Sequence, residues 1–96
     1  MDQLARISEM EERLNRAAGA LTRLDAALAE LETLHRDVAA LASYYEGPLW
    51  RADFEADEEG LLPRELPRGV LSEDAVYDLL EQYSECMTRL KEAAEL

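Results

Sequence analysis

The residues of this chain whose types and spacing best suit chemistry are five acids within seven positions. They are Asp53, Glu55, Asp57, Glu58 and Glu59. Alternating carboxylates match the first three ligands of a calcium loop, because Ca²⁺ is bound by hard oxygen donors. The turn glycine of such a loop would fall at Glu58 and its bidentate glutamate at Arg64, so the pattern departs from the loop at two positions. The sequence therefore favours a solvated acidic face on a short helix over a metal site.

Side chains for covalent or acid–base catalysis are few. His35 is the only histidine and falls in an apolar seam, where we expect it to pack or to fix the register of the helices. Glu32, three residues earlier, could accept a hydrogen bond from the protonated imidazole, which would give association a mild pH dependence. Cys86 is the only cysteine, which excludes an intramolecular disulfide, and we expect it to be a small apolar residue near a helix seam. The serines lack a nucleophile elbow, and the chain has no glycine-rich phosphate loop. We expect no enzymatic activity and no cofactor.

The charge of the chain limits its partners. A formal net charge of −12 argues against binding to DNA, RNA or an anionic membrane, because phosphate contact needs clustered Lys and Arg. Mimicry of DNA is also disfavoured. Residues 2–46, which are expected to form one helix, carry nine acids against five arginines, whereas a DNA duplex of the same length carries roughly 40 charges. No segment approaches the roughly 18 apolar residues of a membrane span, and the N-terminus is acidic where a signal peptide is basic. We expect a cytoplasmic protein with no membrane contact.

The longest predicted element of the chain is a helix with an apolar stripe, on which His35 lies. Apolar residues recur every three to four positions from Leu4 to Tyr45, with no proline and only Gly19 as an interruption, which predicts one helix over about 2–46. In heptad notation the a positions are Ile7, Leu14, Leu21, Leu28, His35 and Ala42, and the d positions are Met10, Ala17, Leu24, Leu31, Val38 and Tyr45. Gly47, expected to be left-handed, and Pro48 end this helix.

The remaining residues predict a short helical elbow, a connector and a closing helix. The elbow covers about 49–59 with Gly60 as its cap, and Trp50 and Phe54 share one face of it. Pro63 and Pro67 make the following stretch an extended connector, whose apolar residues (Leu61, Leu62, Leu66, Val70 and Leu71) are expected to pack against the helices. Ser72 caps a helix over about 73–95. The aromatic residues, including Tyr44, Tyr45, Tyr77 and Tyr83, form either a small aromatic core or, around Trp50, a binding anchor.

Two phrases in the central and C-terminal parts resemble a family of short bacterial proteins, domain-of-unknown-function family 4298. The phrases are YYEGPLW (44–50) and DFEADEEGLLPRELPRGVLSEDAVYDLL (53–80), which follow a Glu/Leu-rich opening helix. The stretch LPRELPRGVLSEDAVYDLL is the specific part. The resemblance covers essentially the whole chain and implies a small, mainly helical cytosolic bacterial protein. It supplies no activity, cofactor or catalytic residue.

Together these features predict an all-α, coiled-coil-like helical hairpin that forms a single domain over residues 1–96. A closing helix of about 35 Å would cover only the second half of the first helix, burying Leu28, Leu31, Leu34, Val38 and Leu41. The first half would then need a partner, so we expect a homodimer with Ile7, Met10, Leu14 and Leu21 at its interface, and Trp50 and Phe54 as further interface residues. The alternative is an acidic regulator that binds a basic protein through residues 53–59 with Glu73 and Asp74.

Overall fold

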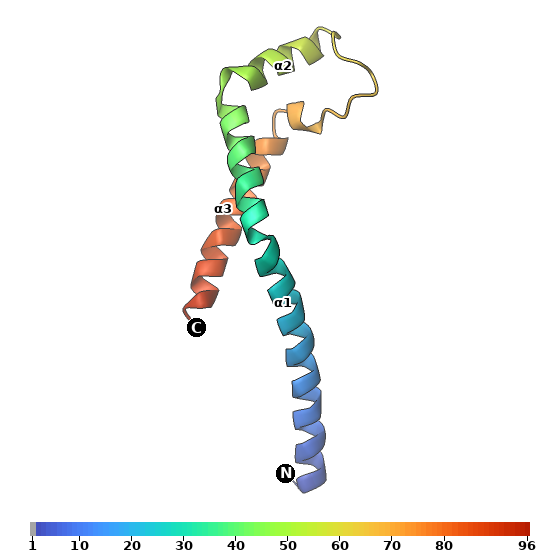
Figure 1. Ribbon diagram of the computed structural model, residues 1–96, viewed down its shortest axis with the longest axis vertical. Coiled ribbons are helices and arrows are strands. Elements are labelled where there is room, and N and C mark those ends of the chain that lie inside the picture. Colours follow the sequence, from blue (N-terminus) through green and yellow to red (C-terminus); the bar gives the residue numbers. More distant parts are fainter. Residues whose placement is uncertain (1) are drawn as a thin grey trace. The chain divides into compact units, whose positions relative to one another are not determined.

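The computed structural model describes residues 2–96, all of whose regular structure is helical. The elements in chain order are α1 (Gln3–Glu46), α2 (Pro48–Glu58), the 3₁₀ helix η1 (Gly69–Leu71) and α3 (Ala75–Ala94) (Figure 1). The predicted all-α order of long helix, short helix, connector and closing helix is thus confirmed. The chain divides into two compact units, Met1–His35 and Arg36–Leu96, and α1 contributes to both. That residues 1–96 form a single domain stays a prediction.

Helix α1 begins with a side-chain cap and is continuous through its only glycine. The Asp2 carboxylate accepts a hydrogen bond of 2.7 Å from the Ala5 N–H, which satisfies one of the unpaired donors of the first turn. Gly19 lies within the helix, so this glycine does not break it. An exposed ion pair joins Arg13 to Glu9 at 2.8 Å, with the two residues four positions apart on the helix.

Gly47 joins α1 to α2, but its backbone differs from the sequence expectation. Its φ of −91° and ψ of 177° are extended rather than left-handed. Pro48 explains this difference, because a residue before proline is restricted to extended conformations. Pro48 then becomes the first residue of α2, where its fixed φ and missing N–H suit a helix start.

Gly60 ends α2 as the sequence predicts. Its φ of +72° is in the left-handed region that glycine tolerates best. The Gly60 N–H donates to the Asp57 carbonyl and the Leu61 N–H donates to the Ala56 carbonyl, both at 3.0 Å. This pair of bonds is a Schellman motif, which satisfies carbonyls at the end of the helix.

The connector between α2 and α3 is more structured than an extended chain. The Leu66 N–H donates to the Pro63 carbonyl, and η1 follows three residues later. Ser72 does act as a cap, since its hydroxyl accepts a bond of 3.2 Å from the Ala75 N–H. Glu73 and Asp74 form a turn, so α3 begins two residues later than predicted.

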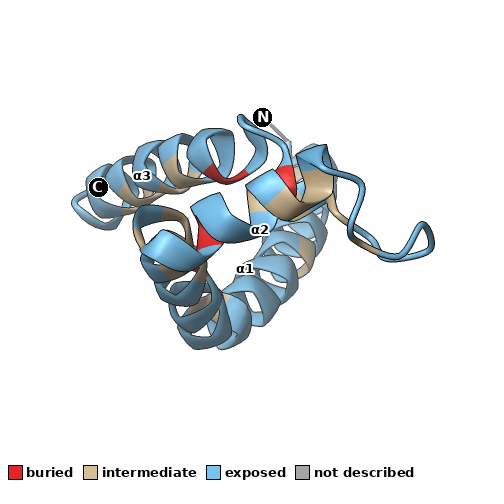
Figure 2. Ribbon diagram, turned by 90° about the horizontal axis from the view of Figure 1, so that it is seen from above, coloured by how far each residue is buried: buried red, intermediate tan, exposed pale blue. Residues whose placement is uncertain are grey.

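The core of the unit Arg36–Leu96 takes one buried residue from each of its four elements. These are Val38 of α1, Trp50 of α2, Leu71 of η1 and Val76 of α3 (Figure 2). The Tyr45 hydroxyl donates to the Glu73 carbonyl, which joins the end of α1 to the turn before α3. The core therefore forms at the elbow of the chain, a term that here covers the end of α1, helix α2, the connector and the start of α3.

Burial is less extensive than the sequence suggests. Of the five α1 residues expected in the core only Val38 is buried, whereas Leu31 and Leu41 are half-buried and Leu28 and Leu34 are exposed. Leu28 and Leu34 belong to the unit Met1–His35, outside the elbow that supplies the core. In the connector Leu71 is buried and Leu62 and Val70 are half-buried, but Leu61 and Leu66 are exposed. Leu66 closes the turn that Pro63 initiates, and Leu61 directly follows Gly60 at the end of α2.

The unit Met1–His35 consists, where described, of helix α1 alone. None of residues 2–35 is buried, and only Glu9, Gly19 and Leu31 are half-buried. Within residues 2–96, none of the helices combines the length and the apolar character needed to cross a bilayer.

Candidate functional site

Three aromatic rings form the centre of the elbow. The Trp50 ring stacks on Phe54 with centroids 5.2 Å apart and meets Tyr45 edge to face at 5.1 Å. The indole N–H donates a bond of 2.9 Å to the Val70 carbonyl, so the polar atom of this buried ring is satisfied. The expectation of a small aromatic core therefore holds for Trp50, which is 8% exposed, with Phe54 and Tyr45 half-buried beside it. Any interface role for Trp50 and Phe54 stays a prediction.

A hollow opens beside these rings. It is lined by Tyr45, Trp50, Arg51, Phe54, Glu73, Asp74 and Tyr77. Tyr77 is 53% exposed and is the accessible aromatic residue of this group. The lining combines one cation and two carboxylates with four aromatic side chains, so the hollow suits a small mixed surface contact better than a reaction centre.

The acidic run does not behave as one patch. Asp53 accepts a hydrogen bond of 2.6 Å from the Tyr44 hydroxyl, and Asp57 accepts one of 2.5 Å from Arg68. Glu55, Glu58 and Glu59 are exposed. Among residues 2–96, no three His, Cys, Asp or Glu side chains gather closely enough to hold a metal ion. The run therefore stabilises the elbow at two of its five positions.

The bond to Asp53 also changes the acidity of Tyr44. Donation to the carboxylate, followed by desolvation and by repulsion from the Asp53 charge, raises the pKa of Tyr44 from 10.0 to about 12. All three causes favour the neutral phenol, because the tyrosinate would place a second negative charge against Asp53. The partner of Tyr44 lies nine residues ahead, across the Gly47–Pro48 junction, so helical periodicity does not indicate this pair.

Arg68, which the sequence pattern does not indicate, is the side chain of the connector with the most hydrogen bonds. Its guanidinium donates to the Asp57 carboxylate and to the carbonyls of Pro63 and Leu66. One side chain thus joins the last turn of α2 to two points of the connector. The only sequence signal for it was a base placed shortly after an acidic run.

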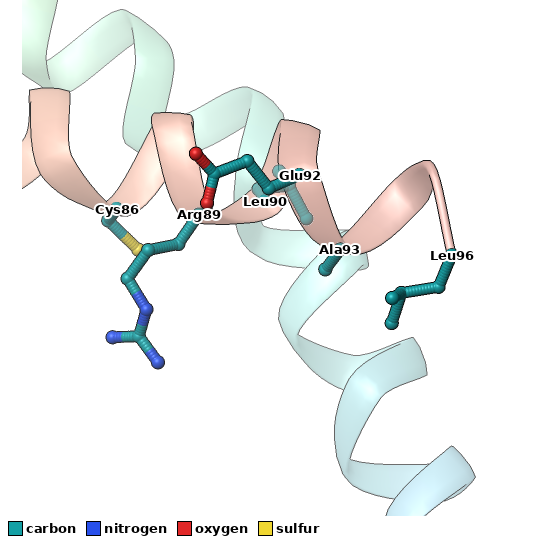
Figure 3. A pocket seen from close by; sticks show the side chains of 6 residues that line it. All are labelled: Cys86, Arg89, Leu90, Glu92, Ala93 and Leu96. Carbon is teal, nitrogen blue, oxygen red and sulfur yellow. The ribbon is translucent and has the colours of Figure 1, made fainter.

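A second hollow lies on α3 (Figure 3). It is lined by Cys86, Arg89, Leu90, Glu92, Ala93 and Leu96, which come from one helix and the residue that ends the chain. Cys86 is exposed, whereas the sequence suggested an apolar residue near a seam. His35 is also exposed.

The most extensive feature is the apolar stripe of α1. Exposed fractions are 57% for Ile7, 49% for Met10, 62% for Leu14 and 65% for Leu21. Leu4, Leu24 and Leu28 continue the same surface at 79%, 50% and 50%. Isolated exposed apolar residues are common on proteins, but a contiguous row of large exposed side chains is unusual.

Comparison with known proteins identifies a family. The family described as "Domain of unknown function (DUF4298)" matches residues 7–92. No curated protein and no solved structure gives a significant match to the chain. The match spans both the apolar stripe and the elbow.

Proposed function

Because the chain belongs to the DUF4298 family, whose function is unknown, we propose from its surface that it is a small interaction module that self-associates as a homodimer. The contact is made by the first half of α1, through the row of Ile7, Met10, Leu14 and Leu21. The protein acts by binding rather than by catalysis, and its place of action is the cytoplasm.

The exposure of this row is the observation that supports the proposal. All four side chains are about half exposed or more, although they occupy the a and d positions that bury side chains in a coiled coil. Full burial of such a side chain is worth about 1.5 to 3 kcal/mol, so covering the exposed part recovers about 1 kcal/mol for each. A second copy offers the same row, and a twofold contact is the commonest way to cover it.

A charged residue in the row tests the proposal. Leu14→Glu places a carboxylate at an a position, so this variant is expected to be monomeric at micromolar concentration while the unaltered chain has the mass of a dimer. Ala26→Glu adds the same charge at an exposed f position and is expected to remain a dimer. Light scattering gives the masses, and circular dichroism checks the helix content. A monomeric mass for the unaltered chain would overturn the proposal.

The second candidate is an acidic regulator that binds a basic protein through residues 53–59, Glu73 and Asp74. Its support is that Glu73 and Asp74 line the hollow beside Tyr77, with Glu55 and Glu58 exposed on α2 and Glu59 exposed directly after it. The bonds of Asp53 and Asp57 to Tyr44 and Arg68 reduce the charge available to such a partner. Self-association is therefore the function the geometry supports best.

A further inference from the structure

We infer that the second copy lies parallel to the first and in register along α1, so that Arg6 faces Glu11 of the partner subunit. This orientation rests on the proposed self-association and adds to it the direction of the partner. The inference comes from the charges that flank the apolar row, all of which lie in the described part of the unit Met1–His35.

The two positions that flank a coiled-coil seam carry opposite charge in this chain. The g positions of the first heptads hold Arg6 and Arg13, followed by Ala20 and Ala27. The e positions hold Glu11 and Asp25, with Ala18 between them. Every charged g residue in residues 4–31 is thus a base and every charged e residue is an acid, and all four charged side chains are exposed.

This separation of charge decides between the two orientations. In a parallel pair each g residue faces the e residue of the following heptad on the partner, which places Arg6 against Glu11 of the partner subunit twice by symmetry. In an antiparallel pair g faces g and e faces e. That arrangement offers no attractive pair in any register, and with Leu14 opposite Leu24 of the partner subunit it sets Glu11 against an acid, Asp25 of the partner subunit.

The a and d positions of the row support the choice of a second copy of α1 as the partner. A strict repeat of 3.5 residues drifts by about 20° per heptad on a straight helix, so the row stays covered only if two helices supercoil around each other. The stripe keeps this repeat from Ile7 to Leu24 without a polar residue at a or d. A partner that offers the same repeat, a second copy of α1, meets this condition.

Disulfide trapping tests the direction. With Cys86→Ser as background, Gln3→Cys places one thiol at a d position near the start of α1, and Ala5→Cys places one at the outer f position of the same turn. In a parallel pair Gln3→Cys is expected to form a covalent dimer on mild oxidation, and Ala5→Cys is not. If Gln3→Cys does not link although light scattering shows a dimer, the orientation is wrong and the self-association stands. A monomeric mass for the unaltered chain would overturn both the orientation and the self-association.

Charge exchange gives an independent readout. Arg6→Glu and Glu11→Arg each convert two attractive contacts of the dimer into repulsive ones, so each is expected to raise the dimer Kd about tenfold. The double variant restores opposite charges across a parallel seam and is expected to return to the Kd of the unaltered chain within a factor of about three. A double variant no tighter than the weaker single one would overturn the parallel arrangement.

Discussion

At the scale of single residues, the acids of α2 show how a local partner changes the role of a charge. Asp53 and Asp57 belong to the same acidic run, yet one accepts from a phenol and the other from a guanidinium. A sequence pattern registers five similar carboxylates, whereas the structure separates two that fix the elbow from three that face solvent. The partners of the first two lie nine and eleven residues away, beyond the reach of helical spacing.

Removal of the Asp53 charge is expected to lower the pKa of Tyr44 from about 12 toward 10.0. Asp53→Asn keeps the size of the side chain but no longer favours the neutral phenol by charge. Ultraviolet absorbance of tyrosinate, taken as the difference from Tyr44→Phe, isolates this group from the other tyrosines. An unchanged pKa in Asp53→Asn would show that the carboxylate does not hold the phenol.

The same bond makes stability depend on pH in the alkaline range. The folded pKa of Tyr44 is raised above the ordinary value of 10.0, so the contribution of this bond to stability is fully present below about pH 10. It is lost as the pH rises through the folded value of about 12. Tyr44→Phe lacks the bond and is expected not to show this part of the alkaline decline.

At the scale of elements, the helices could be predicted and the connector could not. Periodic apolar residues, Pro48, Gly60 and Ser72 indicated each helix to within about two residues, because caps and periodicity are local. The connector depends on the three acceptors that Arg68 finds in Asp57, Pro63 and Leu66, which only the folded chain brings together. The burial of the α1 leucines was overestimated for a similar reason, since an apolar pattern does not show how many other segments pack against it.

Arg68 is expected to be the side chain on which the connector most depends. Arg68→Ala removes a salt bridge to Asp57 whose side chains are only 31% and 24% exposed, along with two bonds to carbonyls. The expected loss in the free energy of unfolding is about 1 to 2 kcal/mol. Urea unfolding followed by Trp50 fluorescence measures it.

Two further variants test the role of the Arg68 guanidinium, one by keeping its charge and one as a control at a neighbouring arginine. Arg68→Lys keeps the charge but cannot reach several acceptors at once, so an intermediate loss is expected. Arg64→Ala changes an exposed arginine of the same connector and is expected to cost less than about 0.5 kcal/mol. Equal stability of Arg68→Ala and Arg64→Ala would contradict the role assigned to Arg68.

At the scale of the whole molecule, the charge is divided unevenly. Residues 36–96 carry fifteen acids against six bases, whereas residues 2–35 carry seven against four. The segment that holds the proposed dimer contact is therefore the less acidic one. Two copies still repel each other through their net charge, so apolar contact must provide most of the attraction.

Salt separates the two proposed functions. Self-association through the α1 row is expected to persist at about 1 M salt, where the screening length is about 3 Å, because burial of apolar side chains does not need charge. Capture of a basic protein by the acidic residues is expected to weaken sharply under the same conditions. Sedimentation of the chain alone, and of the chain mixed with a lysine-rich peptide, measures both at low and high salt. Dissociation of the dimer at high salt would contradict an apolar contact.

The bond between the Trp50 indole and the Val70 carbonyl has a consequence for the order in which the chain folds. It spans 20 residues, and the bond from Tyr45 to the Glu73 carbonyl spans 28. Helices α1 and α2 are held by hydrogen bonds between residues close in sequence, whereas the burial of Trp50 also requires the connector, whose Val70 carbonyl accepts from the indole. The time at which Trp50 becomes shielded during refolding is therefore expected to report the closing of the connector.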